Sequence, residues 1–176
     1  MTIEPDTKDW TWVIEKPCNA CGFDPARVRH EDIAARIAAS VDGWAERLAR
    51  PDVRSRPDDH TWSPLEYACH VRDVHGVMTE RLDAMLRTQP VCFADWDQDA
   101  AAVEADYAAQ NPDDVVEQLT AAATGFAELY RLVGDADWGR EGLRGNGSIF
   151  TVETLAYYAV HDLEHHRVDV GLPARS

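Results

Sequence analysis

The chain has 176 residues, 45% of them hydrophobic, which is enough for one domain with a sizeable core. Seventeen basic residues against 32 acidic ones give a net charge of −15. This acidity argues against binding to nucleic acids or to anionic membrane surfaces, because both need basic patches. We find no apolar run of membrane-spanning length and no signal-peptide pattern in MTIEPDTKDW, so we expect a cytoplasmic protein.

Residues 1–29 carry no clean hydrophobic period and are predicted to form an irregular N-terminal extension, with a short extended piece at residues 10–14. Within it, Cys18 and Cys21 form a CxxC motif. One CxxC is half of a zinc knuckle or a redox pair, and no second CxxC completes a four-thiolate site. His30 is a candidate third ligand. A structural metal site, an ordinary turn and a redox pair all stay open.

Residues 30–176 are predicted to form a bundle of four helices, because apolar residues recur there at steps of three and four. Ser63, Pro64 and Glu66 are a strong start signal, with a capping serine, a first-turn proline and a capping box. The other stretches, acidic at 91–110 and glycine-rich at 135–148, are predicted as loops with one short helix and no strands. The four helices are expected at residues 30–50, from Ser63 to before Pro90, from Asn111 and Pro112 onward, and from the capping Thr151 onward.

The last predicted helix carries many metal-binding side chains within the run AVHDLEHHRVDV at residues 159–170. Residues four apart on a helix share a face, with Cβ atoms roughly 5–6 Å apart, close enough to bind one metal ion. Two such pairs are available, His161 with His165 and Asp162 with His166. Any one of these residues alone would more often be a solvated polar group.

A helical wheel favours the second pair. Asp162 and His166 lie along the edge of an apolar stripe that is predicted to face the core, whereas His161 and His165 lie well off it. The stripe consists of Val152, Leu155, Ala156, Ala159, Leu163 and Val170. The opposite side, predicted to face water, carries Glu153, Glu164 and Arg167. The choice is narrow, because tyrosines and valines make this helix apolar on several sides, so the first pair stays open.

His70 is the candidate partner on another helix. It flanks the buried stripe of the second predicted helix, about two turns from the helix start, where a side chain can point into a pocket between helices. Alone it would more often be an ordinary core or boundary histidine. Together with Asp162 and His166 it predicts a metal site of two imidazoles and one carboxylate.

These residues carry a resemblance to a known family. The segments WSPLEYACHVRDV and HDLEHHRVDV resemble the DinB-like superfamily of four-helix metalloproteins, which includes mycothiol-dependent maleylpyruvate isomerases and bacterial thiol S-transferases. The resemblance covers roughly residues 30–171 and implies an all-α, four-helix bundle of the DinB-like type. The N-terminal CxxC segment is not part of it.

The resemblance also implies a ligand set. Such proteins typically bind a divalent metal through one histidine on the second helix and a His-x-x-x-His or Glu-x-x-x-His pair on the last. Carried over to this chain, the ligands are His70, Asp162 and His166. Aspartate at position 162 departs from the usual histidine or glutamate. Being shorter than glutamate, it implies either an ion closer to the last helix or a lower affinity.

Three protein ligands leave positions open on an ion, which is typical of catalytic rather than structural sites. By resemblance, the protein would be a Zn²⁺- or Ni²⁺-dependent transferase or isomerase. It would activate a low-molecular-weight thiol, of the mycothiol or bacillithiol type, against a small electrophile. The alternative is a metal-binding helical bundle that acts as a non-catalytic interaction module, so the sequence leaves open whether the protein is an enzyme.

Further expectations concern the surroundings of the site and the partners. Four residues are candidates for orienting the ligands, although each is better explained as an ordinary surface residue. They are His161, His165, Asp73 and Asp169. The expected partner is a small-molecule substrate. Helical bundles also commonly pair through an exposed apolar face, so a homodimer is one expectation.

Overall fold

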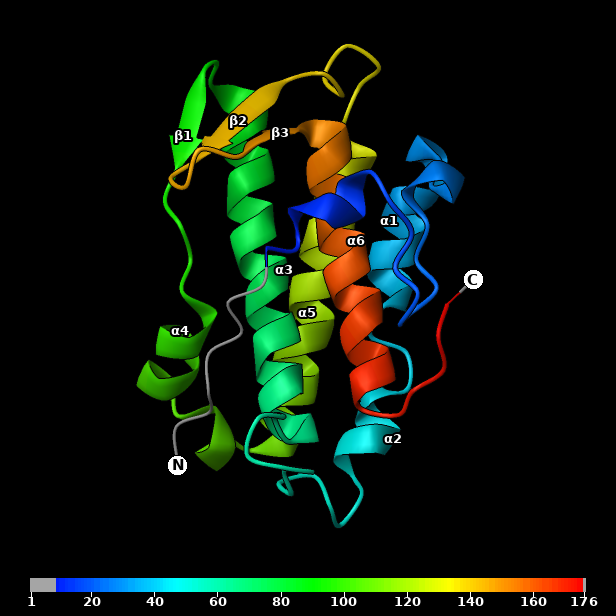
Figure 1. Cartoon of the computed structure of the whole chain (residues 1–176), viewed down its shortest axis with the longest axis vertical. Coiled ribbons are helices and arrows are strands. Elements are labelled where there is room, and N and C mark those ends of the chain that lie inside the picture. Colours follow the sequence, from blue (N-terminus) through cyan, green and yellow to red (C-terminus); the bar gives the residue numbers. More distant parts are fainter. Residues whose placement is uncertain (1–8, 176) are drawn as a thin grey trace.

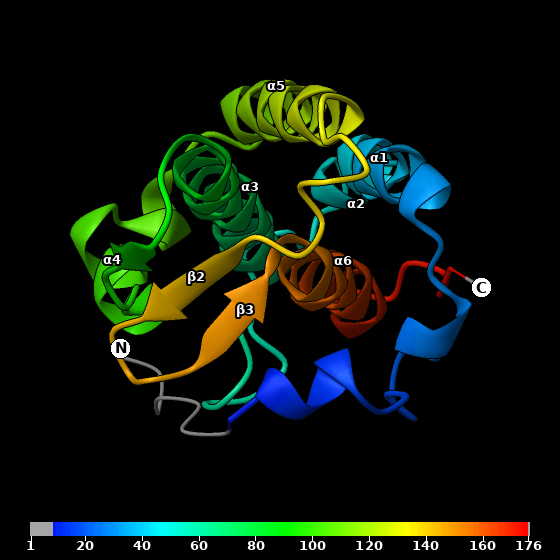
Figure 2. The ribbon, with the colours of Figure 1, turned by 90° about the horizontal axis from the view of Figure 1, so that it is seen from above.

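The computed structural model describes residues 9–175 and is a four-helix bundle with a small sheet across one end (Figure 1). Helices α3, α5 and α6 run along the bundle, and α1 followed by α2 forms its fourth member (Figure 2). None of the described helices is long and apolar enough to cross a membrane. The elements in chain order are η1 Thr11–Ile14, η2 Pro25–Arg27, α1 His30–Ala39, α2 Trp44–Leu48, α3 Pro64–Arg87, β1 Val91–Phe93, α4 Gln98–Glu104, η3 Tyr107–Ala109, α5 Pro112–Arg131, β2 Glu141–Arg144, β3 Ile149–Thr151 and α6 Val152–Asp169.

The starts of the three long helices are confirmed. Ser63 and Glu66 form a capping box at the start of α3, in which each side chain accepts a hydrogen bond from the other's backbone N–H, and Pro64 occupies the first turn. Asn111 caps α5 by accepting two backbone hydrogen bonds. Thr151 caps α6 through its hydroxyl. These caps satisfy backbone N–H groups that a helix leaves without internal partners.

The single helix predicted over residues 30–50 is in fact two helices. α1 ends at Ala39, and α2 begins only at Trp44, after a turn. Gly43 adopts a φ of 82°, a left-handed conformation that glycine tolerates best. Ile37, Trp44 and Leu48 are all buried. The apolar period therefore continues across the break and gives no sign of it.

The expectation of no strands is wrong. The three short strands form one sheet in which β1 pairs parallel with β2 and β2 pairs antiparallel with β3. Gly142, opposite Phe150, lies against the ring of Phe93, and a Cβ there would come within 2.4 Å of that ring. Strands of three or four residues are too short for an alternating pattern to be recognised in the sequence.

Helix α6 is enclosed on more sides than the wheel predicted. Its apolar stripe is buried as expected, but Glu164 and Arg167, predicted to face water, are only 2% and 3% exposed. The carboxylate of Glu164 accepts two hydrogen bonds from Arg36 of α1, at 2.8 and 2.6 Å. Arg167 donates to the backbone carbonyl of Ser40 at 3.0 Å. These residues carry their charge inside the protein because α1 and the residue that follows it, Ser40, supply their partners.

The N-terminal segment covers the remaining side of α6. Its first described part, η1, crosses in front of this helix and packs against it (Figures 1 and 2). The piece predicted as extended at residues 10–14 is therefore wrong in conformation, since η1 is a 3₁₀-helix at Thr11–Ile14. Val13 of this segment is fully buried. Residues 1–8 of the predicted extension lie outside the described residues.

Candidate metal centre

The structure brings together the three residues selected from the sequence. His70 on α3 and Asp162 and His166 on α6 each offer one ligand atom, and these atoms all lie within 4.8 Å of one another. Oδ1 of Asp162 lies 3.5 Å from Nε2 of His70 and 3.3 Å from Nε2 of His166. The two imidazole rings are nearly perpendicular, with centroids 4.8 Å apart. The three donors thus converge on one point between two helices.

Several of these donor atoms are buried without a hydrogen-bond partner. His70 has no exposed surface, and among the described residues neither of its ring nitrogens has a partner; the same holds for Oδ1 of Asp162. A buried polar group without a partner costs about 1–3 kcal/mol. A divalent cation would satisfy the imidazoles and the carboxylate together, and this donor set is one that Zn²⁺ and Ni²⁺ accept. The residues therefore fit a metal ion.

The protonation states also suit metal binding. Burial lowers the pKa of His70, so its imidazole is neutral at pH 7. Burial raises the pKa of Asp162, but its interactions with the nearby imidazoles of His166 and His70 outweigh this effect. The carboxyl pKa therefore lies well below its usual range. A neutral imidazole and an ionised carboxylate are the forms that coordinate metals.

Asp169 orients one of the ligands. Its Oδ2 accepts a hydrogen bond from Nδ1 of His166 at 2.8 Å, one turn along α6. Because a carboxylate only accepts, Nδ1 carries the proton and Nε2 is left as the nitrogen that faces Asp162. Asp169 also lies 3.8 Å from Nε2 of His165, beyond hydrogen-bond distance. Of the four orienting candidates, Asp169 is the one whose hydrogen bond to a predicted ligand is seen among the described residues.

Aromatic side chains enclose His70. The ring of Trp96 stacks on it at 5.5 Å between centroids, and the ring of Trp62 lies at 5.1 Å from it.

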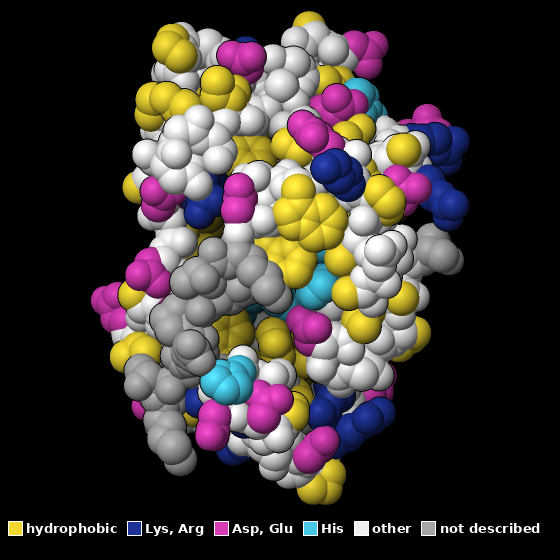
Figure 3. Space-filling model, viewed as in Figure 1, with side chains coloured by type: hydrophobic (Ala, Val, Ile, Leu, Met, Phe, Trp, Pro, Cys, Tyr) yellow, Lys and Arg dark blue, Asp and Glu magenta, His cyan; other side chains and the backbone are white. Residues whose placement is uncertain are grey.

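Two cavities adjoin these tryptophans. One cavity of about 380 Å³ is lined partly by Trp96 and Arg81. Another, of about 250 Å³, is lined partly by Trp62 and Asp169. Figure 3 shows histidine atoms in a recess among hydrophobic side chains near the middle of this face. Trp62 belongs to the segment WSPLEYACHVRDV that carries the resemblance, whereas nothing in the sequence ties Trp96 to His70.

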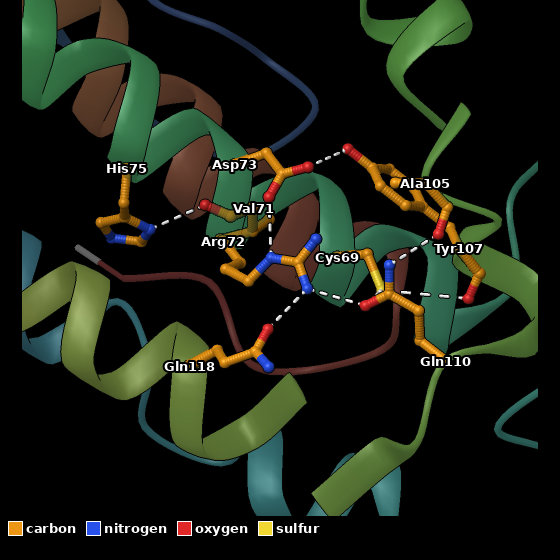
Figure 4. A network of polar contacts seen from close by, with 9 residues as sticks. All are labelled: Cys69, Val71, Arg72, Asp73, His75, Ala105, Tyr107, Gln110 and Gln118. Carbon is orange, nitrogen blue, oxygen red and sulfur yellow. Dashed lines mark hydrogen bonds and ion pairs between the residues drawn. The ribbon is translucent and has the colours of Figure 1, made fainter. Parts of the chain in front are cut away.

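Asp73 belongs to a different network, drawn in Figure 4. Its carboxylate accepts hydrogen bonds from Arg72, at 2.7 Å, and from the hydroxyl of Tyr107. Arg72 in turn donates to Gln110 at 2.7 Å, which ties α3 to the segment after α4. His75 lies in the core, where Nδ1 donates to the carbonyl of Val71 at 2.7 Å. Asp73 thus orients an arginine and a tyrosine rather than an imidazole.

His161 and His165 lie in a second cluster. Their ligand atoms and the sulfurs of Cys18 and Cys21 all lie within 4.8 Å of one another. The prediction that these histidines are surface residues is wrong for His161, which is 4% exposed. Burial lowers the pKa of His161 to about 4 and raises that of Cys21 to about 12.

His30 does not complete the CxxC, contrary to the hypothesis of a third ligand. Its Nε2 lies 2.7 Å from the carboxylate of Glu153, and its ring stacks on Trp138 with centroids 3.8 Å apart. These contacts fix the start of α1 against the start of α6. Neither of the two clusters of metal-binding side chains among the described residues includes His30.

Fold and geometry together define the class of protein. It is a four-helix bundle in which two imidazoles and one carboxylate lie together between helices α3 and α6. The chain belongs to the DinB superfamily, whose family model matches residues 34–169.

One solved structure shares the fold. It is described as "YfiT from Bacillus subtilis is a probable metal-dependent hydrolase with an unusual four-helix bundle topology". YfiT is 18% identical to this chain, with a TM-score of 0.67 over 78% of this chain and 80% of YfiT. At this identity the likeness concerns the fold alone. No curated protein matches the sequence.

Proposed function

We propose that this protein is an enzyme that depends on a divalent metal ion held by His70, Asp162 and His166. The observation that carries the proposal is the convergence of these donors, with buried atoms of His70 and Asp162 left without hydrogen-bond partners among the described residues. The description of YfiT as a probable metal-dependent hydrolase supports it. Zn²⁺ and Ni²⁺ are the ions we favour, because both accept imidazole and carboxylate ligands.

Each surrounding side chain has a task that follows from its contacts. A three-ligand set leaves room at the ion for a further ligand. A bound divalent ion supplies Lewis-acid chemistry, which lowers the pKa of a coordinated thiol or water so that it becomes a nucleophile at neutral pH. Asp169 holds the proton on Nδ1 of His166 and so keeps its Nε2 directed at the site. Trp62 and Trp96 cover His70 and limit the access of water.

The nucleophile we favour is a low-molecular-weight thiol of the mycothiol or bacillithiol type. This follows from the resemblance to thiol-dependent isomerases and transferases of the superfamily. The reaction is then transfer of the thiol to a small electrophile, or a thiol-assisted isomerisation. A small-molecule substrate also agrees with the net charge of −15, which disfavours a nucleic acid as the substrate.

Hydrolysis is a second candidate. The description of YfiT favours it, and the same three ligands would serve if water replaced the thiol. The two reactions differ in one requirement, because only the first needs an added thiol.

Metal analysis tests the proposed ligands. Protein purified without chelator is expected to carry an ion that the His70→Ala variant loses. His30→Ala is the matched control, since this histidine lies outside both clusters and should leave the metal content unchanged. Equal metal content in wild type and in His70→Ala, with both folded, would contradict the proposed ligand set.

Turnover assays then separate the functions. The metal-loaded protein is incubated with a panel of small electrophiles and esters, with and without a low-molecular-weight thiol. Loss of substrate that needs both metal and thiol supports the transferase. Metal-dependent loss without thiol supports the hydrolase instead. Metal binding with no turnover under either condition favours a non-catalytic metal-binding module and counts against the enzyme.

A further inference from the structure

A second group of potential ligands lies on another face of α6, outside the centre described above. Cys18 and Cys21 come from the N-terminal segment, and His161 and His165 come from α6. Residues some 140 positions apart in the chain thus place two sulfurs and two imidazoles in one cluster. Sγ of Cys18 lies 3.6 Å from Nδ1 of His165. This is about the sulfur-to-nitrogen separation across a tetrahedral zinc ion, roughly 3.6 Å for Zn–S near 2.3 Å and Zn–N near 2.05 Å.

The backbone around the two cysteines forms a tight knuckle. The N–H of Gly22 donates to the carbonyl of Cys18, and the N–H of Cys18 donates to the carbonyl of Phe23, both at 2.8 Å. Gly22 adopts a φ of 80°, which favours glycine. The N–H of Phe23 also interacts with the sulfur of Cys21. The turn therefore holds both cysteines towards α6, and CxxC with His-x₃-His matches the ligand spacing of structural zinc sites.

The cluster is enclosed and contains an unsatisfied donor atom. Cys18 and Cys21 are each 3% exposed and His161 is 4% exposed. Nε2 of His161 is buried and has no hydrogen-bond partner among the described residues. Rings of Trp10 and Phe23 pack on His161, with centroids 5.7 and 5.5 Å away. Neither the bundle nor the packing of the N-terminal segment explains why an imidazole nitrogen should be buried there without a partner.

We propose that Cys18, Cys21, His161 and His165 form a second metal site, a closed Zn²⁺ site that fastens the N-terminal segment to α6. On binding, both thiols release their protons to solvent and bind as thiolates, while the imidazoles bind in their neutral form. Two thiolates balance the charge of Zn²⁺, so the assembly is neutral, as a buried site requires. Four protein ligands leave no position for a substrate, so this site is structural.

In the absence of added thiol, this site differs from the His70 centre in one property that can be measured directly, because only its protein ligands include sulfur. Cobalt(II) bound by thiolates absorbs in the near ultraviolet through thiolate-to-metal charge transfer, whereas cobalt bound by imidazole and carboxylate does not. The full-length protein loaded with cobalt is therefore expected to show this absorption. The His70→Ala variant should keep it, and the Cys18→Ser/Cys21→Ser variant should lose it together with one ion per chain. Cys92→Ser is the matched control, since this exposed cysteine lies outside the cluster.

The outcomes separate this proposal from the enzymatic one. Thiolate absorption in a protein with only one bound ion would support the second site and count against the His70 centre. Absence of this absorption from cobalt-loaded wild type would overturn the second site. A disulfide between Cys18 and Cys21 in the metal-loaded protein, detected by mass spectrometry, would also overturn it and identify a redox pair. If the double cysteine variant does not fold, the spectra of wild type and of His165→Ala still decide, because His165→Ala should weaken cobalt binding and change the absorption.

Discussion

Replacing Asp169 by asparagine should weaken metal binding at the His70 centre. The carboxylate of Asp169 accepts a charge-assisted hydrogen bond of 2.8 Å from Nδ1 of His166. Asparagine has nearly the same size and can still accept a hydrogen bond through its amide oxygen, but it removes the negative charge. Since that charge makes His166 a stronger ligand and fixes its ring, the Asp169→Asn variant should lose affinity without losing the fold.

The expected loss is about tenfold to thirtyfold in metal affinity. Changes to groups that orient a ligating histidine cost 10–100-fold, or about 1.4–2.8 kcal/mol. The side chain of Asp169 is 28% exposed and that of His166 is 19% exposed, so solvent screens part of the interaction. We therefore expect the lower half of that range. The contact of Asp169 with His165, at 3.8 Å, is too long to add a second hydrogen bond.

Competition with a chromogenic chelator measures this affinity, and the thiolate absorption of cobalt shows which ions belong to the cysteine cluster. Asp73→Asn is the matched control, because Asp73 bonds Arg72 and Tyr107 instead of a ligand. Its metal affinity should stay within about twofold of wild type. Wild-type metal affinity in Asp169→Asn, or weaker binding by Asp73→Asn than by Asp169→Asn, would contradict this role of Asp169.

Three further predictions concern stability, measured as the free energy of unfolding in urea. Burial lowers the pKa of His75 to about 4 from an ordinary value near 6.5, so only the unfolded state takes up a proton between these values. Unfolding free energy should fall by about 2 kcal/mol between pH 7.5 and 5 through this group, and a folded His75→Gln variant with an unchanged pH slope would contradict this. Gly142→Ala should lose about 1–3 kcal/mol, because its Cβ would lie 2.4 Å from Phe93, and an unchanged stability would contradict the packing of the sheet. Gly76→Ala, in α3 with no atom within 4 Å of the added Cβ, should gain about 0.5–1 kcal/mol; a loss would show that the space is not open.

The bundle could be predicted from the sequence because each long helix has local signals, namely a capping residue followed by a periodic apolar pattern. Ser63 and Thr151 are placed directly before apolar periods, and both cap as expected. The break at Gly43 was missed because the apolar spacing continues through it into Trp44. The sheet was missed because its pairing joins residues some 50 positions apart, such as Cys92 with Leu143, and short strands carry too little pattern.

The candidate centre could be predicted only in part. His70, Asp162 and His166 were found because helical spacing places two of them together and the resemblance adds the third. His161 was misjudged because a helical wheel shows the angles between side chains but not what covers each side. Here an irregular segment covers it, and such a segment has no period from which its position could be deduced.

Consecutive residues of α6, His165 and His166, belong to different clusters, and the carboxylate of Asp169 lies close to both, at 3.8 and 2.8 Å. If both clusters hold ions, an ion bound at one cluster changes the electrostatic field at the carboxylate of Asp169. This in turn changes the interaction of Asp169 with the histidine of the other cluster. Thermodynamic linkage makes any such influence reciprocal, with one common factor for both affinities. The occupancy of the cysteine cluster would then change the metal affinity of the His70 centre through the single turn of α6 that carries His165, His166 and Asp169.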